Sequence, residues 1–138
     1  MPITDAAGAL EFIRTNHRAI IAVRRADGTP AMSPIVAGVL DDVIVISSRE
    51  TAYKVRSVRA DPHAWLCVIP DGFFGRWIHV AVDVEIVAMP DALEPLKAYY
   101  RAIAGEHPDW AEYAATMVRE QRVLLRCTPT EVGPTKQG

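Results

Sequence analysis

The chain has 138 residues, half of them hydrophobic, and a formal net charge of -2. This length suits one compact domain over residues 1–138 and is too short for two domains of ordinary size. The charge gives no electrostatic reason to expect a nucleic-acid or anionic-membrane partner. No basic N-terminal segment precedes an apolar run, and no segment approaches the roughly 20 apolar residues of a membrane span. We therefore expect a soluble, cytoplasmic protein.

Apolar periodicity and turn residues predict four helices and six strands. Thr4 and Asp5 offer capping oxygens to the first helix, and Asp27-Gly28 supplies the positive φ that a hairpin turn needs. A second turn falls at Asp41-Asp42, and we expect the tail over 134–138 to be frayed. The predicted elements are, in chain order, a helix at 4–15, strands at 18–25, 31–39 and 43–47, a short helix at 51–60, strands at 63–70 and 77–87, helices at 91–103 and 109–120, and a strand at 122–129.

This order of elements predicts the fold class. Six strands with local hairpins, one short helix between the third and fourth strands, and a late helical pair favour a closed antiparallel barrel of the α+β class with peripheral helices. We expect the first helix to cover one end of the barrel and the helical pair to lie on its outside. An open sheet is the alternative.

Sequence motifs with strong catalytic geometry are absent. The chain has no glycine-rich dinucleotide or P-loop motif, no GxSxG elbow and no HExxH. The four histidines are scattered without ligand spacing, so we expect no metal site. Cys67 and Cys127 lie singly in apolar runs, and we expect both to be buried, inert thiols. His107 precedes Pro108 at a helix break, where capping is its natural role.

The segment from Ser47 to Lys54 is the most informative for function. It places hydroxyls, Arg49 and Lys54 between a strand end and a helix N-terminus. Free backbone N–H groups and the helix dipole favour an anion there, and the cations add charge and directional donors. The pattern therefore indicates a phosphate cradle. A capped surface helix with solvated cations is the alternative that the spacing leaves open.

The order of several segments resembles the pyridoxamine 5′-phosphate oxidase-like split-barrel family. They are LEFIRTNHRAIIAVRRADGTPAMSPI, DDVIVISSRETAYKVRSVRADPHAWLCV, FFGRWIHVAVDVEIV and YYRAIAGEHPDWAEYAATMVREQRVLL. Within this family the chain is most similar to the actinobacterial branch that uses the deazaflavin coenzyme F420. The IAGEHPDWAEY segment is distinctive of that branch, and the likeness covers nearly the whole chain.

This resemblance implies a six-stranded split β-barrel that works as a homodimer, with a cofactor site in each cleft between subunits. Lys54 would contact the cofactor phosphate, and the FFGRW stretch of the partner subunit would complete the site. An apolar cleft with Phe73, Phe74 and Trp77 would receive a flat substrate over the ring. The candidate cofactor-binding residues are Ser33, Pro34, Ile35, Val36, Ser47, Ser48, Arg49, Lys54 and Trp77, with Arg56 added for its charge beside Lys54, and the candidate substrate residues are Phe73 and Phe74.

The expected activity is hydride transfer between reduced F420 and a conjugated small-molecule acceptor. The cofactor would carry the difficult step, which agrees with the lack of an acid/base triad. Arg49 and Arg56 flank Lys54 and would attract the acidic tail of F420. Two departures from the family pattern, Val82 for a glycine and Ala52 for a cation, keep an FMN-dependent oxidase or reductase as an alternative. A non-catalytic cofactor-binding protein is the third reading.

Overall fold

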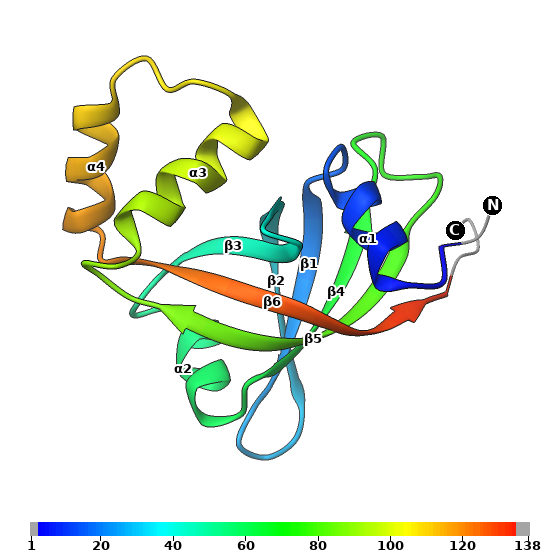
Figure 1. Ribbon diagram of the computed structural model, residues 1–138. Helices are drawn as coiled ribbons and strands as arrows, with labels where there is room; N and C mark the ends of the chain where they lie inside the picture. The colour runs from blue at the N-terminus through cyan, green and yellow to red at the C-terminus, as the bar shows by residue number, and fades with distance from the viewer. Residues whose placement is uncertain (1–2, 135–138) are drawn as a thin grey trace.

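The computed structural model describes residues 3–134, which form six antiparallel strands and four helices (Figure 1). The strands pair in the order β1-β2-β3-β6-β5-β4, and β1 pairs with β4 to close the barrel. The predicted α+β split barrel is therefore confirmed, and the open-sheet alternative is wrong. The elements are α1 (Ala6–Ile13), β1 (Arg18–Arg24), β2 (Pro30–Leu40), β3 (Val43–Arg49), α2 (Tyr53–Ala60), β4 (His63–Ile69), β5 (Ile78–Val87), α3 (Leu93–Ala104), α4 (Trp110–Arg119) and β6 (Arg122–Gly133).

Alternation along the strands separates the barrel interior from its outer face. In β1, Ala19, Ile21 and Val23 are buried, whereas Ile20 between them is exposed. The same period of two fills the interior from β3, β4, β5 and β6 with branched aliphatic side chains. Burial of this apolar surface is the main favourable contribution to folding.

The two predicted hairpin turns have the backbone that their sequences require. Gly28 has φ 87°, and Asp41 and Asp42 have φ 49° and 60°. In the second turn, positive φ at both Asp41 and Asp42 is the type I′ geometry, whose twist matches that of the flanking strands, whereas in the first turn Gly28 alone has positive φ. The first turn therefore joins β1 to β2, and the second joins β2 to β3.

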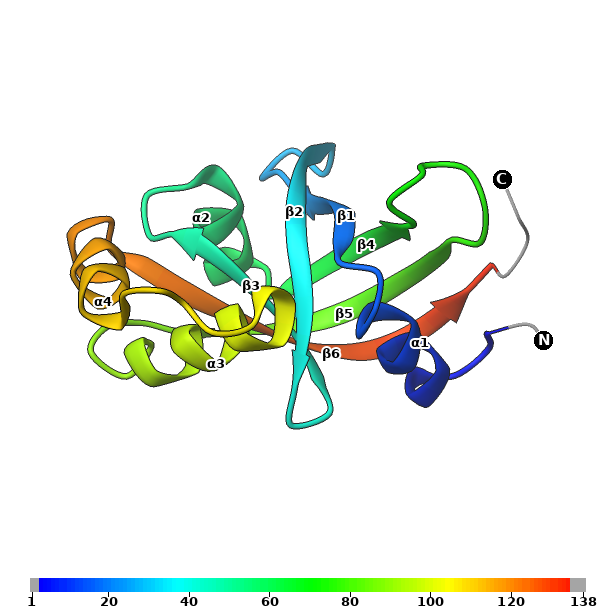
Figure 2. The ribbon, with the colours of Figure 1, turned by 90° about the horizontal axis from the view of Figure 1, so that it is seen from above.

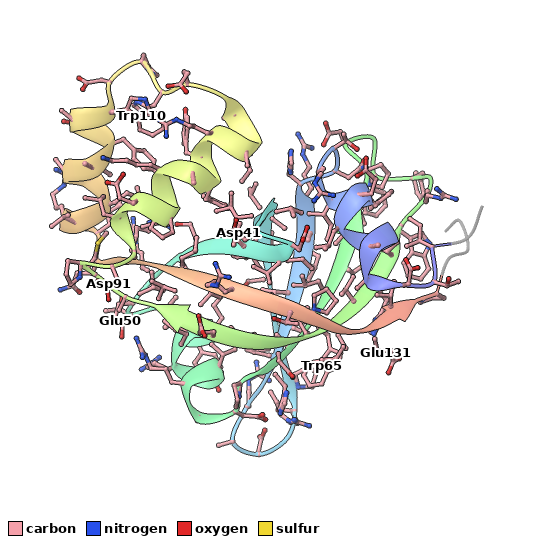
Figure 3. The ribbon with its side chains drawn as sticks, viewed as in Figure 1. Asp41, Glu50, Trp65, Asp91, Trp110 and Glu131 are labelled. Carbon is pink, nitrogen blue, oxygen red and sulfur yellow. The ribbon has the colours of Figure 1, made fainter. Side chains whose placement is uncertain are left out.

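The helices cover separate parts of the barrel. Asp5 caps α1 by accepting a hydrogen bond from the Gly8 amide at 2.8 Å. Figure 2 shows α1 and α2 on opposite sides of the barrel strands. The α3–α4 pair lies outside the barrel, as expected, and packs on β2, β3 and β6. Between these two helices Trp110 packs with Tyr100, His107 and Tyr113 (Figure 3).

Several element boundaries differ from the sequence prediction. The third strand continues to Arg49, because Ser48 and Arg49 pair with Val123 and Arg122 of β6. The last strand continues to Gly133, which pairs with His79 of β5. The expected frayed tail lies outside the described residues, apart from residue 134. None of the helices within residues 3–134 is long and apolar enough to cross a membrane.

The two cysteines have different environments. Cys127 is fully buried, and burial raises the pKa of its thiol to about 12. Cys67 is only half-buried, so the expectation of burial was wrong for this residue. The β1–β4 register pairs Cys67 with the exposed Ile20, which places it on the outer face of the sheet.

The barrel is incomplete between β2 and β3. These strands pair only from Ala37–Leu40 to Val43–Ile46. Residues 30–36 of β2 pair with β1 alone, and residues 47–49 of β3 pair with β6 alone. We call the resulting gap between residues 30–36 and residues 47–49 the split.

Candidate functional site

The backbone of β2 presents polar groups to the split. The Ala37 amide donates to the His17 carbonyl at 2.7 Å, toward β1. Because backbone groups alternate sides along a strand, those of Val36 and Pro34 face the opposite way, into the split. Pro34 has no N–H, so a proline at this position removes no ladder hydrogen bond.

Tyr99 of α3 closes one end of the split. Its hydroxyl donates to the Val36 carbonyl at 2.8 Å. Burial raises the pKa of Tyr99, while a hydrogen bond with the Ser47 backbone and the charge of Arg122 act in the opposite direction. The hydroxyl thus joins β2 to β3 where their own pairing ends.

A hollow of about 260 Å³ opens beside the split. Two strands, the start of α2 and the first residue of β6 supply its walls. It contains six of the residues that the sequence and the family resemblance assigned to the cofactor. The lining residues are Pro34, Ile35, Ser47, Ser48, Arg49, Ala52, Lys54 and Arg122.

Lys54 is the cation best placed inside this hollow. Its Nζ lies 3.4 Å from the Ser33 hydroxyl, which brings a further predicted residue into the site. Burial lowers the pKa of Lys54, and the nearby charge of Arg122 lowers it further. Lys54 forms no ion pair with a carboxylate within residues 3–134. A half-buried lysine beside a second cation favours the binding of an anion.

Arg122 is a site residue that the sequence analysis missed. It stands opposite Arg49 in the β3–β6 ladder, so two guanidinium groups meet at this end of the sheet. Glu120 accepts a hydrogen bond from Arg122 Nε at 2.9 Å and lies 3.6 Å from Arg49. Neither terminal nitrogen of Arg122 has a hydrogen-bond partner among the described residues. This fork is therefore available to a ligand.

The start of α2 adds backbone donors to the same place. Ala52 is the N-cap residue and offers no side-chain hydrogen bond to the first turn. The amides of Tyr53 and Lys54 have no backbone or side-chain acceptor within residues 3–134. Such amides and the helix dipole favour an anion. Lys54, Arg49, Arg122 and this helix start together form what we call the anion cradle.

Other predicted residues lie elsewhere in the protomer. Arg56 stands over the Tyr53 ring at 5.6 Å and lines a neighbouring hollow with Arg24 and Arg25, outside the cradle. Val36 meets the site through its backbone, while its side chain is exposed on the outer face of the barrel.

The aromatic residues are the most distant from the cradle. Phe73 and Phe74 form an exposed edge-to-face pair in the loop between β4 and β5, and Trp77 follows in the same loop. This loop lies beside α1, toward the end of the barrel away from α2 (Figures 1 and 2). Within one protomer these three residues do not line the hollow.

The two departures from the family pattern differ in their structural consequence. Val82 is buried in the barrel interior and does not line the hollow at the split. Ala52 does line it, and leaves the start of α2 without a capping side chain. Only the second departure touches the anion cradle.

A comparison with known families agrees with this architecture. The sequence profile of a family described as Pyridoxamine 5′-phosphate oxidase matches residues 7–136. The chain belongs to the pyridoxamine 5′-phosphate oxidase family. Placement in its actinobacterial F420 branch stays a prediction.

Solved structures of the same fold include proteins whose names indicate different functions. A conserved hypothetical protein of Mycobacterium tuberculosis has a TM-score of 0.77 at 19% identity, over 95% of this chain and 84% of its own. An F420 reductase has a TM-score of 0.69 at 22% identity, over 89% and 94%. An FMN-binding, pyridoxamine 5′-phosphate oxidase-related protein of Nostoc punctiforme has a TM-score of 0.60 at 17% identity, over 90% and 74%. At these identities the likeness shows the fold of the family alone.

We predict that Tyr99→Phe lowers the free energy of unfolding by about 1 kcal/mol, because the Val36 carbonyl loses its hydrogen bond. Urea unfolding measures the change. Tyr100→Phe is the matched control, since the Tyr100 hydroxyl has no hydrogen bond within the described part of the chain, and it should change stability by less than about 0.5 kcal/mol. Equal effects of the two variants would contradict the role of Tyr99.

We also predict that Lys54 titrates below the ordinary pKa of lysine, and that Arg122→Gln raises this pKa without fully restoring it, because burial is the larger cause. The unfolded chain then holds more protons between the folded and unfolded pKa values of Lys54, so this group makes the free energy of unfolding rise with pH across that window. Carbon NMR of the lysine ε positions is practical because the chain has only three lysines. Arg119→Gln, on α4, is the control. An unchanged Lys54 pKa in Arg122→Gln would separate Arg122 from the cradle.

Proposed function

We propose that the chain is an F420-dependent reductase that transfers hydride from the reduced deazaflavin to a conjugated small-molecule acceptor. The observation that carries this proposal is the anion cradle beside the split, where Lys54, Arg49, Arg122 and the uncapped start of α2 face one hollow. Family membership and the fold shared with an F420 reductase support it. An FMN-dependent oxidase or reductase is the second candidate, because an FMN-binding protein shares the fold as well.

The residues present fit a cofactor that carries both a ring and a phosphate. Lys54, the free fork of Arg122 and the first-turn amides of α2 would hold the phosphate. The β2 backbone at the split would meet polar atoms at the edge of the ring, while Pro34 and Ile35 would exclude water from it. When bound, the deazaflavin supplies the hydride. The protein then has to position the ring and keep the site dry, which needs no acid/base triad.

A second hollow beside α2 favours F420 over FMN. Arg25 and Arg56 line it, while Arg24, in the same hollow, is held by Asp61 at 2.7 Å. Tyr53 lines this second hollow and Lys54 lines the first, so the two hollows lie on neighbouring faces of α2. An acidic tail that continues past the phosphate would run from Lys54 toward Arg56. FMN ends at its phosphate and gains nothing from this hollow.

We further propose a homodimer formed through the outer face of β1 and β2. Ile20, Met32 and Val36 on this face have exposed fractions of 36%, 69% and 44%. Exposed apolar side chains gathered on one sheet favour association. A hollow of about 260 Å³ in one protomer encloses only part of a flavin-sized ligand, so a second copy would supply the missing wall. Its exposed Phe73–Phe74 pair is suited to cover the ring and the substrate. A cytoplasmic location stays a prediction from the sequence.

We predict that Lys54→Ala weakens cofactor binding about 10- to 150-fold while the thermal unfolding midpoint changes little, because a charge-assisted phosphate contact contributes roughly 1.5–3 kcal/mol. Fluorescence titration with F420 and FMN side by side measures both affinities. Lys97→Ala is the matched control, since Lys97 pairs with Glu94 on α3 at 3.1 Å and does not line the hollow.

The same titrations distinguish the two cofactors. F420 affinity should fall with added salt more steeply than FMN affinity, because screening acts on each additional exposed charge pair. Arg56→Gln should reduce this extra salt dependence and leave FMN binding unchanged. Tight, salt-insensitive FMN binding with no measurable F420 binding would replace the proposal with the FMN alternative. Binding of either cofactor without turnover of any acceptor would favour a non-catalytic carrier.

We predict that the protein sediments as a dimer at micromolar concentration, and that Ile20→Asp raises the dimer dissociation constant at least about tenfold, because a carboxylate would be desolvated at the centre of the interface. Ile20 stands opposite Pro34 of β2 in the β1–β2 ladder, and its side chain is exposed on the proposed face. Val118→Asp is the control, since Val118 is an exposed apolar residue of α4 outside this face. A monomeric wild-type protein would refute the shared site.

A further inference from the structure

Glu120 is the one carboxylate that contacts the arginines of the anion cradle within residues 3–134. It follows α4 and precedes Gln121, whose φ of 51° turns the chain into β6. Its side chain is 27% exposed, accepts from Arg122 Nε at 2.9 Å, and lies 3.6 Å from the Arg49 guanidinium. Any phosphate held by these arginines therefore has a fixed carboxylate as its neighbour.

The other acidic group near this end of β3 is already neutralised. Glu50 (Figure 3) accepts two hydrogen bonds from Arg59 at 2.6 and 2.7 Å. Glu120 itself is ionised at neutral pH, because the hydrogen bond and charge of Arg122, with a smaller contribution from Arg49, hold its pKa below the ordinary value. Glu120 thus lies against two of the three cradle cations, Arg49 and Arg122, without itself lining the hollow.

Repulsion from a fixed carboxylate scales with the charge of the ligand. A phosphomonoester carries a charge of about -1.5 to -2 at pH 7, because its second pKa is about 6. A phosphodiester carries a single charge. The penalty imposed by Glu120 is therefore up to twice as large, in free energy, for a monoester as for a diester.

We infer that Glu120 is a specificity-determining residue, which shifts the preference of the cradle from a phosphomonoester dianion toward a phosphodiester monoanion. This inference rests on the proposed function and deepens it, because the phosphate of F420 is a diester and that of FMN is a monoester. Glu120 also holds Arg122 through Nε, so that the terminal nitrogens of Arg122 are left for the ligand. Its charge and its hydrogen bond have separable effects.

Glu120→Gln separates these two effects, since it removes the charge and keeps an oxygen that can accept from Arg122 Nε. At pH 8 it should strengthen binding of methyl phosphate, a dianion, about three- to tenfold more than binding of dimethyl phosphate, a monoanion. Chemical-shift titration of the backbone amides at 48–54 measures both affinities. FMN and riboflavin 5′-methyl phosphate, compared by fluorescence, should show the same change in ratio on one ring.

Control variants exclude a merely structural role for Glu120. Glu112→Gln, on α4 and 3.9 Å from Arg119, should leave the ratio unchanged. Glu120→Ala should change the ratio in the same direction but bind both phosphates more weakly than Glu120→Gln, because Arg122 is no longer held. A ratio in Glu120→Gln equal to that of the wild type would overturn the inference.

The test is independent of the proposed cofactor. The small phosphates need no ring, so failure of deazaflavin binding with an altered phosphate ratio would refute the proposed function and leave the role of Glu120 standing. Deazaflavin binding with an unaltered phosphate ratio would overturn the role of Glu120 and leave the proposed function standing. If neither phosphate shifts the 48–54 amides in any variant, there is no anion cradle and the inference is overturned.

Discussion

The incomplete pairing of β2 with β3 is the constraint on which the rest of the structure depends. A barrel with full-length ladders would satisfy every backbone group of these strands with a neighbouring strand, whereas here the β2–β3 ladder stops at Ala37 and Ile46. The polar groups beyond that point need other partners, because unpaired buried backbone groups are costly. Tyr99 supplies one partner through the Val36 carbonyl, and Pro34 avoids the need for another. The hollow exists because no strand fills the remaining gap.

Electrostatic repulsion between the cations of the cradle makes the site suited to an anion. The charge of Arg122 adds to burial in lowering the pKa of Lys54, so this arrangement is unfavourable in the absence of an anion. Such a cluster of cations lowers stability, and clusters of this kind are typical of sites where a bound anion neutralises the charge. The aromatic and apolar parts of the proposed site need no such tuning, and they lie on exposed surfaces that a second copy would cover.

Local patterns made much of the fold predictable from the sequence. Alternating apolar residues marked the strands, Asp27-Gly28 and Asp41-Asp42 marked the turns, and the Ser47–Lys54 segment pointed to an anion because its residues are consecutive. Arg122, Tyr99 and Glu120 were missed because they reach the site through the β3–β6 register and the packing of α3, which no local pattern encodes. Cys67 was misplaced because its strand is apolar on both faces.

The α3–α4 hairpin has a consequence for how this family can diversify. Tyr99 comes from α3 and Glu120 from the end of α4, while the barrel strands and α2 supply the remaining groups of the site. The hairpin packs on the outside of the barrel and shares little of the interior core. The hairpin can therefore vary separately from the side chains of the interior core. Substitutions within it can change the groups that face the ligand without changing the side chains that fill the barrel interior.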